Sequence, residues 1–122
     1  MRTQNLKMTH GDDETFDVVV TNEKTGAAMP IPGCMFWFTA KSALTDADPG
    51  VFQLKSPSDG VAIVDEPSGT LTVTVPRAAT AGLPYEQTVL EYDFQMKDAS
   101  ANVKTVTRGT LTIDPDVTRV TT

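Results

Sequence analysis

The chain has 122 residues, which is the length of one ordinary domain, so we expect a single domain over residues 1–122. Its formal net charge is −6, and this acidic balance argues against nucleic acid and anionic membranes as partners, because both attract clustered Lys and Arg. One cysteine, Cys34, excludes an internal disulfide. With one histidine, His10, the chain also lacks the ligands of a Cys–His zinc site.

The first ten residues contain no apolar signal region, and no stretch reaches the roughly 18 consecutive apolar residues that a membrane helix needs. We therefore expect the chain to be made and folded in a reducing cytoplasm, where an unpaired thiol is normal. This expectation concerns synthesis only, because an assembled particle can carry a protein elsewhere.

Thr and Val dominate short runs that alternate with period two, as in Thr70–Val75 and Thr110–Ile113. β-Branched residues fit a pleated, half-buried surface, and clusters of Gly, Pro, Asp and Ser separate the runs. The pattern predicts an all-β sandwich or barrel of about seven to eight strands. The expected strands are 3–9, 15–22, 34–42, 51–55, 61–65, 69–75, 88–97 and 103–113.

The same alternation assigns a face to the longer strands. Side chains expected to point into the core include Phe16, Val18, Val20, Leu71, Val73, Val75, Leu90, Tyr92, Phe94 and Met96. In the last strand Val106 is at an even position whereas Leu111 and Ile113 are at odd ones, so a bulge is expected at Arg108–Gly109. A helical turn is expected near 77–83, after Pro76, and it is at most a single turn.

The apolar segment 34–38 also alternates. If Cys34, Phe36 and Phe38 face the core, then Met35 and Trp37 point outward. An outward Trp and Met on a small domain are covered either by a loop of the same chain, here 43–50, or by another chain. Cys34 itself is expected to be a buried, small hydrophobic side chain whose thiol has a raised pKa and little reactivity.

No catalytic residue, cofactor site or metal site is predicted, and the chain is not expected to be an enzyme. His10 lies in a turn-like segment and is expected to be exposed. The plentiful functional groups are carboxylates in turns, which fall in three clusters: residues 12–17, 46–48 and 114–116. None has the spacing of an EF-hand loop, so we expect solvated turns, with calcium binding as the open alternative.

Several segments together resemble small immunoglobulin-like domains of tailed bacteriophages. These segments are Gly11–Val20, with its Gly-Asp opening and amphipathic strand; Met35–Lys41, similar to a Trp-Phe-Thr-x-Lys strand; Pro67–Val75; Tyr92–Asp98, similar to a Tyr-Asp-x-Gln strand; and Gly109–Arg119. The resemblance runs from about residue 5 to 119 and includes the N-terminal domain of phage baseplate upper proteins. It implies an immunoglobulin-like antiparallel β-sandwich.

The resemblance also implies a function. We expect a structural component of a virion, made in the host cytoplasm, that assembles with other virion proteins and with copies of itself. Because the sequence stops at Thr122, no receptor-binding module is expected in it. Segments 1–4 and 116–122 are expected to be extended arms. The residues expected to contact partners are Met35, Trp37, Val117, Arg119 and Val120.

The alternative is a carbohydrate-binding β-sandwich for host or cell-surface glycans. Such a protein needs exposed aromatic platforms, and the pattern leaves Trp37 and Tyr85 for that role. Only 7% of the residues are aromatic, and most of them fall on inward positions. This second reading therefore ranks below the first.

Overall fold

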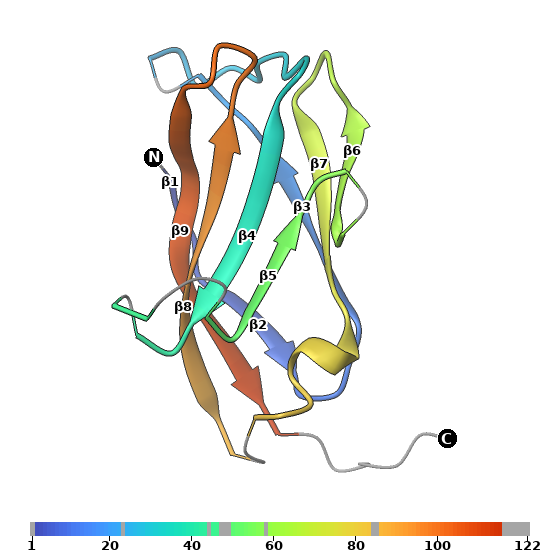
Figure 1. Cartoon of the computed structure of the whole chain (residues 1–122), viewed down its shortest axis with the longest axis vertical. Helices are drawn as coiled ribbons and strands as arrows, with labels where there is room; N and C mark the ends of the chain where they lie inside the picture. Colours follow the sequence, from blue (N-terminus) through green and yellow to red (C-terminus); the bar gives the residue numbers. More distant parts are fainter. Residues whose placement is uncertain are drawn as a thin grey trace.

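The chain folds into two β-sheets whose strands run along the long axis of the molecule (Figure 1). The computed structural model describes residues 2–22, 24–43, 45–46, 50–57, 59–83 and 86–115. The architecture is an immunoglobulin-like β-sandwich, which confirms the predicted fold class.

The larger sheet has the order β1–β9–β8–β4–β5, and β2 also pairs with β9. The smaller sheet has the order β3–β7–β6. In immunoglobulin domains the first, second, fourth and fifth strands form one sheet. Here β3, β6 and β7 take the places of the second, fourth and fifth strands, whereas the first strand, split into β1 and β2, pairs with the last strand in the other sheet. The strands of the larger sheet are β1 (Arg2–Thr3), β2 (Leu6–Thr9), β4 (Met35–Lys41), β5 (Phe52–Lys55), β8 (Thr88–Lys97) and β9 (Val103–Asp114). Those of the smaller sheet are β3 (Glu14–Val19), β6 (Val61–Asp65) and β7 (Thr70–Val75).

The predicted alternation fixes the core. Leu71, Val73 and Val75 of β7 are fully buried, and the even-numbered residues of β8 from Leu90 to Met96 are buried against them. Aromatic rings stack at the centre: the Phe36 and Phe94 centroids lie 5.4 Å apart, and those of Phe38 and Tyr92 lie 5.0 Å apart. Each fully buried ring of this kind contributes about 1.5–3 kcal/mol through the hydrophobic effect.

The phase change in the last strand occurs, but the predicted position at Arg108–Gly109 is wrong. Phe94 pairs with Thr107 and Gln95 pairs with Thr105, so Val106 is the extra residue of the bulge. Val106 packs partly against the core, and the next residue, Thr107, is buried as well. The bulge lets two successive residues approach the core side, which a regular strand does not allow.

The first expected strand is split in two. β1 and β2 both pair with β9 in parallel and in the same register, and the chain breaks the ladder between them at Gln4–Asn5. Asn5 bridges the break, because its Oδ1 accepts hydrogen bonds from the Thr110 backbone N–H and hydroxyl. Residues 2–3 of the expected N-terminal arm therefore belong to the sheet.

The expected helical turn is present as a short 3₁₀ turn, Arg77–Ala79. It follows Pro76, whose extended backbone precedes the turn as predicted. The expected arm over 116–122 lies outside the described residues.

Candidate binding groove on the large sheet

The outer face of the large sheet carries the side chains that strand alternation directs away from the core. On β4 these are Met35, Trp37, Thr39 and Lys41, so the outward direction predicted for Met35 and Trp37 is confirmed. In antibody domains the tryptophan of the corresponding strand is buried. Here the neighbouring phenylalanines fill the core, and the single tryptophan is left on the outer face.

Strand register aligns these residues with partners from distant parts of the sequence. Trp37 lies opposite Gln95 of β8, and Thr39 lies opposite Asp93. On its other side, Thr39 lies opposite Gln53 of the edge strand β5. Directly paired residues on one face have their Cβ atoms about 4.5–5.5 Å apart, so each pair forms a neighbouring set of side chains.

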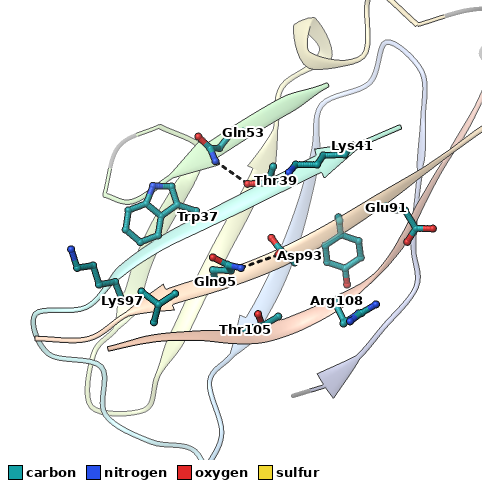
Figure 2. A pocket seen from close by; sticks show the side chains of 12 residues that line it. Trp37, Thr39, Lys41, Gln53, Glu91, Asp93, Gln95, Lys97, Thr105 and Arg108 are labelled. Atoms are coloured by element: carbon teal, nitrogen blue, oxygen red, sulfur yellow. Dashed lines mark hydrogen bonds between the residues drawn. The ribbon is translucent and has the colours of Figure 1, made fainter. Parts of the chain in front are cut away.

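These rows border a hollow of about 550 Å³, which we call the polar groove. Figure 2 shows the labelled side chains of its lining, which come from β5, β4, β8 and β9. The volume lies within the range of about 300–1,000 Å³ that small-molecule sites occupy. The groove is lined by Trp37, Thr39, Lys41, Gln53, Glu91, Tyr92, Asp93, Gln95, Lys97, Val103, Thr105 and Arg108.

Hydrogen bonds hold two of the polar side chains in place. The Gln53 side-chain amide donates to Thr39 Oγ1 at 3.0 Å, and the Gln95 amide donates to Asp93 Oδ2 at 3.1 Å (Figure 2). Thr39 is only 7% exposed, although it points to the outer face, so it lies at the floor of the groove. The two amides are therefore oriented before any ligand arrives.

Charges of both signs line the groove. Lys41, Lys97 and Arg108 carry positive charge, while Glu91 and Asp93 carry negative charge. The two carboxylates are half-buried on β8, whereas Lys97 and Arg108 are exposed. The formal net charge of the lining is therefore +1. Its two carboxylates are less exposed than Lys97 and Arg108.

The five predicted partner residues have different outcomes. Met35 is 46% exposed. Residues 44 and 47–49 of the 43–50 loop that could cover it lie outside the described residues. Trp37 is half-buried in the wall of the polar groove. Val117, Arg119 and Val120 lie outside the described residues, as does Tyr85, the second aromatic platform of the carbohydrate-binding alternative. A partner-binding role for these residues stays a prediction.

The expectation that His10 is exposed is wrong, because the side chain is only 3% exposed. Its Nε2 lies 3.2 Å from the Leu83 carbonyl oxygen, and the next residue, Gly11, donates its N–H to Thr80 Oγ1. Thr80 is fully buried. His10 thus joins the end of β2 to the loop after the 3₁₀ turn, and the sequence could not show this because 73 positions separate the two.

Several turn carboxylates act as backbone caps. Asp13 accepts a hydrogen bond from the Arg77 N–H at 2.8 Å, and Asp98 accepts two from Ser100 and Asn102 at 2.9 Å each. The pKa of Asp98 is lowered, first by the Asn102 backbone N–H and also by the Ser100 N–H. The pKa of Asp114 is lowered by the Gln87 amide and then by Lys7, whose ammonium lies 3.0 Å away.

Cys34 lies just before β4 and packs partly against the core. Desolvation raises the pKa of its thiol, and the nearby Asp98 and Glu66 carboxylates raise it further. The direction of the pKa agrees with the prediction, and a raised pKa disfavours the nucleophilic thiolate. The predicted burial is only partly met, because Cys34 is half-buried.

Sequence reasoning missed the polar groove as a unit. The inward side chains predicted for Leu90, Tyr92, Phe94 and Met96 leave the alternate residues of β8 on the outer face, and the structure has Glu91, Asp93, Gln95 and Lys97 there. Sequence reasoning could not place Gln53 or Arg108 beside them, since strand pairing between distant segments leaves no local signal.

No family model matches the chain, and no curated protein matches it. Within the described ranges, no three or more His, Cys, Asp or Glu side chains gather in a way that could hold a metal ion. A helix with the length and apolar character to cross a membrane is also absent from the part of the chain that the structure describes.

Proposed function

We propose that this chain is a structural subunit of a tailed-bacteriophage virion and that it acts by protein–protein assembly. The observation that carries the proposal is the position of the phage-like segments in the fold. Met35–Lys41 coincides with β4, and the Gly109–Arg119 segment begins within β9. Gly11–Val20 includes β3, Pro67–Val75 includes β7, and Tyr92–Asp98 ends β8. The resembling segments therefore fall on strands of a single domain, in the order of the chain.

The smaller sheet offers a surface suited to assembly, which we call the threonine face. Most of its paired residues are small and uncharged: Thr15 lies opposite Thr74, and Thr72 lies between Ala62 and the charged Asp17. Threonine has few rotamers, so burying it against a partner costs little conformational entropy. The outward positions of this sheet are Thr15, Asp17, Val19, Ala62, Thr70, Thr72 and Thr74.

Two exposed valines add apolar area to this face. Val19 is 39% exposed, and Val64, the extra residue where the β6–β7 register shifts, is 60% exposed. Val64 stands on the edge strand of the smaller sheet, where unpaired backbone groups allow contact with another chain. Copies of this chain and other virion proteins are the proposed partners.

The direct test is mass spectrometry of phage particles purified on a density gradient from the source culture. We expect peptides of this chain at a fixed ratio to the capsid or tail proteins, because a structural subunit is present in a set number per particle. A chain that occurs in the infected-cell lysate but is missing from purified particles would contradict the proposal.

A further inference from the structure

We propose that the polar groove is a binding site for a neutral oligosaccharide, with one pyranose ring stacked on Trp37. This site lies on the outer face of the large sheet, whereas the threonine face belongs to the other sheet. It therefore adds a ligand-binding activity to the assembly role and does not depend on it.

The groove combines one apolar platform, Trp37, with polar walls. The half-buried indole of Trp37 is the one aromatic side chain that the lining presents on the outer face, since Tyr92 directs its ring into the core. The electron-rich face of an indole attracts the weakly positive C–H groups of a flat ring. A ligand that fits needs one apolar face and a polar rim, and a pyranose ring has both.

The polar side chains of the groove can bind hydroxyl groups and are already held in place. Gln53 and Gln95 present planar amides that can donate and accept, and Asp93 presents a carboxylate that can accept from two hydroxyls. These groups are already oriented by the bonds to Thr39 and between Gln95 and Asp93. Pre-oriented donors and acceptors bind hydroxyl groups with a smaller entropy cost.

The mixed charge of the groove disfavours polyanions. A nucleic acid could also stack a base on Trp37, but its phosphates would meet carboxylates as well as cations, because Glu91 lies opposite Lys41 and Asp93 lies opposite Arg108. Like charges placed together cost binding free energy. Three cations and two carboxylates leave the lining with a formal net charge of +1, so it lacks the concentrated positive charge with which proteins bind polyanions.

The strands under the centre of the groove do not favour a peptide as the ligand. The groove crosses β4 and β8, and each of these strands is hydrogen-bonded to a neighbour on both sides. A peptide strand lying over the centre of the groove therefore finds no free backbone groups on β4 or β8 to pair with. Recognition has to come from side chains, as in the saccharide site proposed here.

Trp37 makes the test direct, because it is the only tryptophan of the chain and its fluorescence reports on the groove alone. Purified protein is titrated with cellopentaose, maltopentaose and chitopentaose, and the same sugars are added to isotope-labelled protein for amide chemical-shift mapping. We expect a saturable fluorescence change with at least one sugar. The shifted amides should fall on β4, β5, β8 and β9 around the groove.

Variants then test the assigned roles by calorimetry, which needs no tryptophan signal. Trp37→Ala should weaken binding at least about tenfold, equivalent to about 1.4 kcal/mol. Gln53→Ala, on the edge strand, should weaken it several-fold without altering the platform. Val89→Ala is the matched control, since Val89 is 52% exposed on the same strand as Asp93 but does not line the groove. It should bind as the unmodified chain does.

Three results would overturn the proposal. The first is the absence of saturable binding to all three sugars and to a glycan array of defined neutral oligosaccharides. The second is full-strength binding by both Trp37→Ala and Gln53→Ala. The third is tighter binding of oligo-dT or of sialylated glycans than of any neutral sugar. None of these results depends on whether the chain is found in phage particles.

Discussion

Gly109 leaves no room for a side chain. An added Cβ would lie 2.1 Å from the Gln4 carbonyl oxygen, and that oxygen already accepts the Tyr92 hydroxyl hydrogen bond at 2.6 Å. The close approach occurs where the chain passes from β1 to β2 beside β9. The glycine therefore serves to admit a neighbouring backbone, and its φ is not in the left-handed region.

Gly109→Ala should destabilise the fold by roughly 1–3 kcal/mol, the usual cost of forcing extra volume into a packed site. The reason is that Gln4 is held on the other side by Tyr92 and cannot move away freely. Urea denaturation followed by fluorescence measures the free energy of unfolding. Gly82→Ala is the control, because nothing lies within 4 Å of its added Cβ, and it should change stability by less than about 0.5 kcal/mol. Equal effects of the two substitutions would contradict the argument.

For single residues, the sequence indicates which positions are unusual but does not give the reason. It marked Gly109 as a break in alternation and assigned the bulge there, whereas the bulge is at Val106. Likewise His10 was expected in solvent, and it is buried against a loop that is distant in sequence. In both cases the missing information is a contact between segments that only the folded chain brings together.

Among the elements, the β8–β9 hairpin is the longest pairing in the molecule, and its turn depends on Asp98. Asp98 Oδ1 accepts the backbone N–H groups of Ser100 and Asn102. The same turn places Ala101 at a φ of 67°, a left-handed conformation that non-glycine residues rarely adopt. The aspartate therefore stabilises a turn that its own sequence makes locally unfavourable.

Asp98→Ala should lower the melting temperature at neutral pH, because the two N–H groups lose their acceptor. The pKa of Asp98 is lower in the folded chain, so the carboxylate contributes stability above its unfolded pKa and loses it as pH falls through its folded pKa. The difference from the unmodified chain should shrink in acid. Thermal unfolding by circular dichroism between neutral and acidic pH checks this, with Asp12→Ala, an exposed turn carboxylate, as the control. A difference that stays constant with pH would contradict the assignment.

The elements themselves were largely predictable. Period-two alternation located every strand within a few residues and gave the correct inward side chains on β7 and β8, because one face of each strand is buried. Pairing was not predictable in the same way. The groove depends on Trp37 lying opposite Gln95 and Thr39 opposite Gln53, and alternation does not say which strands are neighbours.

For the whole molecule, the two outer faces have different chemistry. The large sheet is hollowed and carries charged and amide side chains, whereas the smaller sheet presents threonines and two exposed valines. A face of mostly small, uncharged side chains is suited to protein contacts, and a polar hollow is suited to a hydrated ligand. The proposed division of roles follows from this contrast.

Val64→Lys should weaken assembly, because it places a charge at the edge of the threonine face. Val89→Lys on the opposite sheet should not, although the two valines are similarly exposed at 60% and 52%. Native mass spectrometry and incorporation into purified particles measure the effect. Surface substitutions of this kind usually change folding stability by less than about 0.5 kcal/mol, so both variants should fold. If Val89→Lys alone impaired incorporation, the assembly surface would lie on the large sheet.

The parallel pairing of β1 and β2 with β9 also has a mechanical consequence. Because the first and last strands run in the same direction side by side, a pull on the start of β1 and the end of β9 acts along both in opposite senses. Tension then shears all the backbone hydrogen bonds between these strands at once, instead of breaking them one after another. A domain connected in this way transmits force through its two terminal segments while the rest of the sandwich stays unloaded.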